Sequence, residues 1–189
     1  MNTHTKQSGF TLIETLVSIS IFSVSLVALI VASSQGISDM QFIKGRLTAT
    51  YLAQEGIELV RNVRDEQLEF GSGSTSAANW SSFMNFVSSC GISSGTVGCM
   101  IDGVSNAGSN PIFKNSCTTF CGPILYDGSL NGYGYNYTFG NPTNYTRTVS
   151  VKTLSPDEIE IKSTVNFLVG SQTLQVTLYE NILGWTPHQ

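Results

Sequence analysis

An apolar run near the amino terminus limits what this chain can fold into. Residues 10–32 read FTLIETLVSISIFSVSLVALIVA, and no charged residue occurs from Thr15 to Ser38. A helix rises about 1.5 Å per residue, so about 20 such residues cross a bilayer. The run is therefore long enough to span a membrane, where its single carboxylate, Glu14, would need a partner.

Two simple interpretations of this run fit it poorly. A secretory signal peptide has a basic start, 7–15 apolar residues and a small-residue cleavage site. Here Lys6 is the only cationic side chain before the run, the run is longer, and cleavage would fall after Ala32. A plain transmembrane anchor leaves Glu14 as an unexplained cost of roughly 2.5–3.5 kcal/mol at the bilayer centre.

A third interpretation accounts for Glu14. In Ser8-Gly9-Phe10-Thr11-Leu12-Ile13-Glu14, a hydrophilic leader ends in Gly, Phe follows, and Glu stands four residues later. This resembles the class III signal of type IV prepilins. The resemblance implies that a membrane-embedded aspartyl peptidase cuts between Gly9 and Phe10 and methylates the new amino group of Phe10. The cut would create a cationic amine one helical turn from Glu14, so this pair is expected to form during assembly, within one subunit or between neighbours.

The sequence after the apolar run predicts that the helix continues. No proline precedes Pro111, and helix formers dominate residues 41–68. An apolar stripe recurs in steps of three or four and should be covered: Met40, Ile43, Leu47, Thr50, Ala53, Ile57, Val60 and Val63. One helix from Phe10 to about Gln67 would be roughly 87 Å long, which resembles the pilin spine. Many pilins have a proline kink, and here we expect local unwinding at residues 33–36 instead.

Alternating apolar and polar residues from Tyr145 onward predict β-strands. Turns are expected at residues 155–157 and at Gly170-Ser171, which suits a type II′ hairpin. The pattern gives three antiparallel strands, and residues 133–139 could add a fourth. The predicted class is α+β, the pilin fold: a very long N-terminal helix, apolar then amphipathic, packed on a small C-terminal antiparallel sheet of three to four strands.

The region between the helix and the sheet is rich in Gly, Ser and Asn and contains all four cysteines: Cys90, Cys99, Cys117 and Cys121. An even number in an exported domain favours two disulfides. Of the three connectivities we prefer the local one, Cys90–Cys99 and Cys117–Cys121, over a four-thiolate zinc site that lacks the C-x2-C spacing. A short helix is expected from Asn79 as N-cap, with core side chains at Trp80, Phe83, Phe86 and Val87.

Composition excludes several functions. Charged residues make up 12% of the 189 residues, the net charge is −4 and the sequence pI is about 5.0, so the chain would repel nucleic acid. The two histidines, His4 and His188, leave the middle without the imidazole of Ser/His or Cys/His hydrolases. We expect no nucleic-acid binding, no enzyme activity and no catalytic metal.

Two further patterns are candidate sites. Some pseudopilins use calcium, and residues 102–106 and 127–132 offer oxygen side chains. Neither matches an EF-hand loop, and Asp/Asn-Gly turn chemistry explains both, so no cofactor is expected. Asn136 and Asn144 each begin an N-x-[ST] sequon, a pattern that is common by chance.

The segments 51–62 and 145–185 resemble PilV-type minor pilins. The resemblance implies a structural subunit of a type IV pilus or related filament, with these partners: a prepilin peptidase and methyltransferase, other pilin subunits, an inner-membrane assembly platform, and membrane lipid before assembly. The chain would be a single-pass membrane protein with its head outside the cytoplasm, and later part of an extracellular filament. Two alternatives stay open: an adhesin or tip subunit that binds a surface through residues 71–142, and a pseudopilin of a type II secretion or competence system.

The expected organisation has three parts. They are a leader peptide at 1–9, a transmembrane or filament-core half-helix at 10–38 and a globular head at 39–189. Within the head we expect an amphipathic helix at 39–69, a variable cysteine-stapled region at 70–132 and the antiparallel sheet at 133–189.

Overall fold

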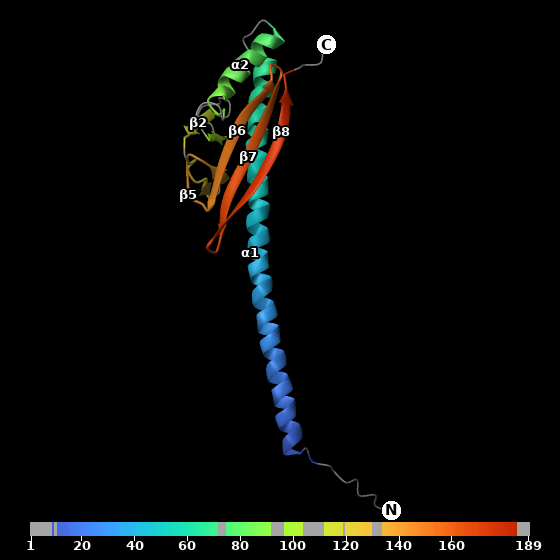
Figure 1. The fold of residues 1–189 in the computed structure, drawn as a ribbon. Helices are drawn as coiled ribbons and strands as arrows, with labels where there is room; N and C mark the ends of the chain where they lie inside the picture. Colours follow the sequence, from blue (N-terminus) through green and yellow to red (C-terminus); the bar gives the residue numbers. More distant parts are fainter. Residues whose placement is uncertain are drawn as a thin grey trace, which may run out of the picture. The chain divides into compact units, whose positions relative to one another are not determined.

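The structure is a computed structural model that describes residues 9, 11–71, 75–91, 97–103, 112–118, 120–129 and 134–184. Contacts divide the chain into two compact units, residues 1–43 and residues 44–189, and each is considered by itself. Two helices and eight strands are found in the described part (Figure 1).

The first helix, α1, runs from Leu12 to Phe70 without a break. The unwinding expected at residues 33–36 does not occur, since all four are helical. The physical reason is that Gly36 costs a helix only about 1 kcal/mol relative to Ala, and no proline removes a hydrogen bond there. α1 is therefore the single long helix that the sequence predicts.

The first unit is the N-terminal part of α1. Every described residue from Thr11 to Ile43 is exposed. The most apolar 18-residue window of the helix has a mean hydropathy of 2.5, and none of it is buried. By length and composition this helix is able to cross a membrane.

The second unit, the head, begins with the C-terminal part of α1. Ala53, Ile57, Val60 and Val63 are buried, as the stripe predicts, whereas Leu47 is exposed. Met40 and Ile43, in the first unit, are exposed as well. The helix also buries positions beside the predicted stripe, which the sequence analysis did not include: Ala49, Leu52, Gly56 and Leu59.

The main sheet has five antiparallel strands in the order β2-β1-β6-β7-β8. Its long strands are β6 (Tyr145–Ser155), β7 (Glu158–Val169) and β8 (Gln172–Leu183), the three that the alternation predicts. Gly170 has φ +61 and Ser171 has no positive φ, consistent with the expected type II′ turn. In Figure 1 these strands run alongside the part of α1 that belongs to the head.

The remaining strands differ from the prediction. β1 (Gly98–Asp102) and β2 (Ile112–Cys117) extend the main sheet, and β1 meets β6 where Cys99 pairs with Val149. A second, three-stranded sheet has the order β4-β3-β5, with bounds Leu125–Asp127 for β3, Gly134–Asn136 for β4 and Asn141–Pro142 for β5. The fourth strand expected at residues 133–139 thus belongs to this second sheet.

The second helix, α2 (Ser76–Ser88), covers the end of α1 and the sheet. The N-cap of α2 is Thr75, whose side-chain oxygen accepts from the Ala78 N–H. The prediction that Asn79 is the N-cap is therefore wrong. Asn79 instead lies inside the helix and donates to the Leu68 carbonyl at 3.4 Å. Trp80 is buried and donates to the Pro156 carbonyl at 2.8 Å, whereas Phe86, expected in the core, is 37% exposed.

Two apolar clusters form the core of the head. One joins α1, α2 and the sheet through residues that include Val60, Phe83 and Ile161. The other joins α1 to β7 and the second sheet through residues that include Leu52, Ile124 and Phe167. Each fully buried side chain of this size contributes about 1.5–3 kcal/mol, so the expected covering of the amphipathic half-helix by the sheet is the main source of stability.

Candidate processing and assembly site

The start of α1 is a capping box. The Thr11 carbonyl accepts from the Thr15 N–H at 3.3 Å, which makes Thr11 the N-cap residue. Its hydroxyl oxygen accepts from the Glu14 N–H at 3.4 Å, and the Glu14 carboxylate accepts from the Thr11 N–H at 3.0 Å and from the Thr11 hydroxyl at 2.9 Å. These reciprocal bonds satisfy donors that a helix start otherwise leaves open.

The capping box places the Glu14 carboxylate next to the expected cleavage point. The carboxylate binds the backbone nitrogen of Thr11, the residue directly after Phe10. Gly9 is exposed and outside the helix, while Phe10 lies outside the described residues. A carboxylate at a helix N-terminus is also stabilised by the helix dipole. The arrangement therefore holds a negative group within one residue of the position where cleavage would create an amine.

Hydroxyl side chains in the apolar part of α1 bind its own backbone. Each donates to a carbonyl three or four residues earlier at 2.7–2.8 Å: Thr15, Ser18, Ser20, Ser23 and Ser25. Such bonds satisfy a hydroxyl without water. Within this stretch they make polar side chains compatible with lipid or with a dry interface between helices.

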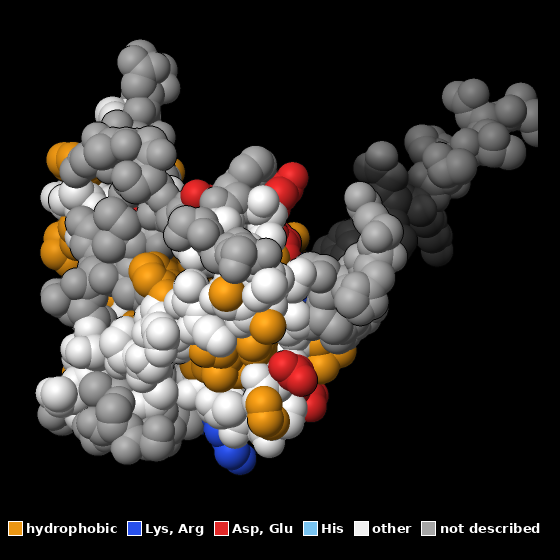
Figure 2. All heavy atoms as spheres, turned by 90° about the horizontal axis from the view of Figure 1, so that it is seen from above, with side chains coloured by type: hydrophobic (Ala, Val, Ile, Leu, Met, Phe, Trp, Pro, Cys, Tyr) orange, Lys and Arg blue, Asp and Glu red, His pale blue; other side chains and the backbone are white. Residues whose placement is uncertain are grey.

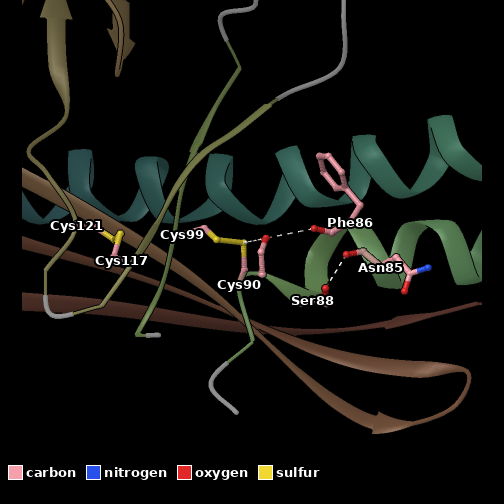
Figure 3. The surroundings of a disulfide bond; sticks show 8 residues. Asn85, Phe86, Ser88, Cys90, Cys99, Cys117 and Cys121 are labelled. Carbon is pink, nitrogen blue, oxygen red and sulfur yellow. Dashed lines mark hydrogen bonds between the residues drawn. A yellow bond between two sulfur atoms is a disulfide. The ribbon is translucent and has the colours of Figure 1, made fainter. Parts of the chain in front are cut away.

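All four cysteines of the head are paired. Cys90 bonds to Cys99 and Cys117 to Cys121, the local connectivity preferred above. As paired, the sulfurs are not thiolates, so they do not form the four-cysteine zinc site that was considered. Figure 3 shows Cys90 just after the last turn of α2, where the Ser88 hydroxyl donates to the Asn85 carbonyl at 2.7 Å. The first disulfide therefore ties the end of α2 to strand β1.

A buried arginine links the elements of the head. The Arg147 side chain on β6 is 3% exposed and pairs with Glu55 of α1 at 2.9 Å. It also donates to the Leu52 carbonyl at 3.0 Å and to the Ile101 carbonyl at 2.8 Å, while its Nε has no hydrogen-bond partner within the described part. Arg147 thus connects α1, β1 and β6 by charge-assisted bonds.

The two aspartates considered for calcium have different surroundings. Asp127 accepts from the Ser129 N–H at 3.1 Å, the turn chemistry expected for it. Asp102 is 1% exposed and accepts from the Tyr137 N–H and the Thr138 hydroxyl, so turn chemistry alone was the wrong explanation there. Among the described residues no group of three or more His, Cys, Asp or Glu could hold a metal ion.

The two sequons also differ. Asn136 is 2% exposed. Its side-chain oxygen accepts from the Thr138 and Phe139 N–H groups, and its side-chain nitrogen donates to the Gly134 carbonyl. Asn144 is exposed. In the folded head only Asn144, of these two, presents its side chain to a modifying enzyme.

Electrostatics in the head follow from these contacts. Burial raises the pKa of Tyr137, and the adjacent Arg147 opposes this in part. A hydrogen bond to Glu180 is the main cause of the raised pKa of Arg61, which joins α1 to β8. On the face seen in Figure 2, few of the described side chains are charged. Two ion pairs, Arg147–Glu55 and Arg61–Glu180, join α1 to the sheet.

Two residues that matter here were missed in the sequence. Thr11 was not assigned a role, although T-x-x-E is the spacing of a capping box and would have identified it. Arg147 alternates with Tyr145, Val149 and Val151 and so shares their strand face, and a charged residue in that register is the signal of a buried ion pair.

Comparison with known proteins identifies one motif. Residues 4–30 match the model of the prokaryotic N-terminal methylation motif, so the chain carries a class III prepilin signal. The match includes Gly9, Phe10, Thr11 and Glu14. No curated protein and no solved structure matches the chain. The long helix packed on an antiparallel sheet gives the chain an α+β pilin-like fold, and the motif supports a pilin-like or pseudopilin protein. The apolar helix and the signal fit a membrane-anchored protein of the cell envelope.

Proposed function

We propose that this chain is a minor pilin, a structural subunit of a type IV pilus or related filament. The observation that carries the proposal is the methylation motif at the start of an apolar helix whose described side chains are all exposed from Thr11 to Ile43. The prepilin peptidase removes residues 1–9 and methylates the amino group of Phe10. An inner-membrane assembly platform then moves the helix from lipid into the filament core. The role is structural rather than catalytic.

Glu14 acts in this step through a change of partner. Before cleavage its carboxylate is bound by Thr11 within the capping box. After cleavage the methylated amine of Phe10 keeps its positive charge and competes for the same carboxylate, in the same subunit or in a neighbour. In an environment of low dielectric constant such a pair is favoured over two separate charges. Pairing with a neighbour would therefore favour the position in the filament in which Glu14 of one subunit lies close to the Phe10 amine of another.

The test compares processing with incorporation in the native host. Cleavage is followed by the change in mass of the chain, and incorporation by its amount in sheared filaments. The proposal expects cleavage after Gly9 and co-purification with other pilins. A chain that is processed but never found with any filament or pseudopilus would contradict it.

A second candidate function is supported by the described parts of residues 71–142. They contribute α2, two disulfides and all of the second sheet. We propose as the alternative an adhesin or tip subunit that binds a surface through this region. Loss of adhesion with intact filaments after replacement of the region would favour this alternative over a purely structural role.

A further inference from the structure

A cavity in the head lies between α1 and the second sheet. It has a volume of about 370 Å³ and is lined by Thr48, Tyr51, Leu52, Glu55 and Tyr135. Ligand pockets in proteins begin at about 300 Å³, so this cavity is large enough for one small ring. It plays no part in the processing and assembly proposed above.

The aromatic walls of the cavity are pre-arranged on one side and exposed on the other. Tyr135 is held by Tyr126, with ring centroids 5.0 Å apart, and by the edge of Tyr145 at 6.0 Å. Tyr51 is 63% exposed on α1, and its hydroxyl makes no hydrogen bond to any described residue. A fixed ring facing the cavity and a second ring open to solvent offer apolar faces to a ligand.

The Glu55 carboxylate at the cavity is fixed in place through one of its two oxygens. One oxygen of Glu55 accepts from buried Arg147 at 2.9 Å, and the Glu55 side chain is 41% exposed. Arg147 is itself held by two backbone carbonyls. The second carboxylate oxygen of Glu55 has no hydrogen-bond partner among the residues the structure describes. It is therefore a positioned acceptor for hydroxyl or amide donors.

The charge balance selects among ligand classes. Arg147 neutralises Glu55, and no other charged residue lines the cavity among those the structure describes, so neither a cation nor an anion would find a net opposite charge there. A wholly apolar ligand would cover the open carboxylate oxygen without a donor, which is unfavourable. A ligand with C–H groups on one face and hydroxyl donors at its edge satisfies both the rings and the carboxylate.

From these features we infer that the cavity is a binding site for a neutral carbohydrate, with one pyranose ring against Tyr51 and Tyr135. The Glu55 carboxylate accepts from hydroxyl groups of the sugar. Thr48 lines the same cavity and offers a further hydroxyl. The site consists of side chains from α1 and β4, so it is present in a single folded head.

The test uses saturation-transfer NMR on the full chain in micelles of a detergent without a sugar or choline headgroup. The probes are methyl β-galactoside, methyl α-mannoside, methyl β-glucoside and N-acetylglucosamine, with N-acetylneuraminic acid and tetramethylammonium as charged comparisons. Transfer to at least one neutral sugar, and weaker transfer to both charged probes, is the expected result. Transfer to none of the neutral sugars, or stronger transfer to a charged probe, overturns the inference.

Matched variants locate the site. Tyr51→Ala removes an exposed ring and should weaken binding about fivefold or more, while Tyr51→Phe keeps the ring and should retain most of the affinity. The control is Tyr179→Ala, which removes another exposed tyrosine, on β8 and outside the cavity, and should change nothing. Equal binding by the Tyr51→Ala variant and the unmodified chain contradicts the site. Because none of these variants touches residues 9–14, filament assembly reports separately on the proposed function.

Discussion

The two parts of α1 both carry apolar side chains, but the surroundings of these side chains are opposite. From Leu12 to Ile43 every residue is exposed, whereas from Ala49 to Val63 the apolar side chains other than Tyr51 are covered by α2 and by the sheets. The second part finds its partner within the chain. The first part has no partner among the described residues of its own unit. In the sequence, a charge-free apolar run marks the first part and an apolar stripe between charged residues marks the second.

The glycines of α1 show the same contrast at atomic scale. A Cβ added at Gly36 would meet nothing within 4 Å, whereas one added at Gly56 would lie 2.7 Å from the Ser163 hydroxyl oxygen and 3.1 Å from Val149. Gly56 permits the sheet to approach the helix backbone. Gly36 has no such neighbour among the residues that the structure describes.

The largest effect is expected at the capping box of the exposed part. Glu14→Ala should reduce incorporation into filaments by about tenfold or more, because the new amine loses its carboxylate, while cleavage after Gly9 continues. The measurement is the ratio of processed chain in filaments to processed chain in the membrane. Glu14→Gln is the matched control, since glutamine keeps a capping box without the charge. Normal incorporation of either variant would show that the charge is not needed.

In the head, the largest loss of stability should come from replacing Arg147, which binds the covered part of α1. Arg147→Ala leaves the Leu52 and Ile101 carbonyls without their donor and Glu55 without its partner. Removing one member of a buried pair typically costs about 3–5 kcal/mol. Urea unfolding of the chain in micelles, followed by tryptophan fluorescence, measures the free energy of unfolding. A loss of stability below about 1 kcal/mol, which is typical of exposed ion pairs, would contradict the role of Arg147 in linking α1, β1 and β6.

The disulfides should contribute next. Chain entropy predicts a loss of about 3 kcal/mol for Cys90→Ser with Cys99→Ser and about 2 kcal/mol for Cys117→Ser with Cys121→Ser, since the second loop is shorter. The same unfolding measurement compares the two double variants. Equal stability of both variants and the parent chain would mean that neither disulfide constrains the head. Filament incorporation through the first unit should persist where the head still folds.

A pair of glycine substitutions tests the contrast itself. Gly56→Ala should destabilise the head by about 1–3 kcal/mol through overpacking, against the usual gain of up to about 1 kcal/mol for alanine in a helix. Gly36→Ala should leave the unfolding of the head unchanged. If Gly56→Ala stabilises the head, the sheet does not approach the backbone of α1 as closely as described.

The smallest effect is expected in alkaline solution. Burial raises the pKa of Tyr137 above its ordinary value of 10.0, so the neutral phenol is favoured in the folded state. Stability from this group is present below pH 10 and is lost as pH rises through the folded pKa, because the unfolded chain ionises first. Tyr137→Phe should reduce this alkaline loss and cost about 1 kcal/mol at neutral pH, since the bond to the Arg147 carbonyl is removed. Unfolding curves at neutral and alkaline pH measure both changes in the free energy of unfolding. If the Tyr137→Phe variant loses as much stability on going to alkaline pH as the unmodified chain, ionisation of Tyr137 is not the cause of the loss.

Periodic features of the fold were predictable from the sequence. α1, β6, β7 and β8 each bury one face over many residues, so their apolar positions repeat with the period of the element. The cysteine region gave no such repeat, and β1, β2 and β3 are short strands within polar sequence. Their existence depends on pairing with distant segments such as Val149, which a local pattern does not contain.

The limits of the buried stripe were less predictable for a related reason. Met40 and Leu47 continue the apolar period, yet both are exposed, whereas Ala49 is buried and an added Cβ at Gly45 would lie 3.2 Å from Phe167. The side of α1 that meets the sheet is therefore not the predicted stripe at this end of the head. At the candidate processing site, the spacing of Gly9, Phe10 and Glu14 carries the expectation, and the T-x-x-E spacing of Thr11 and Glu14 was an available signal for the capping box that the structure shows.

The most direct test of this account is mass spectrometry of the amino terminus of the chain isolated from its native membrane and filaments. The account predicts a polypeptide that begins at Phe10 and carries one additional methyl group on its amino nitrogen. A chain that still begins at Met1, or one cut after Ala32, would contradict the account.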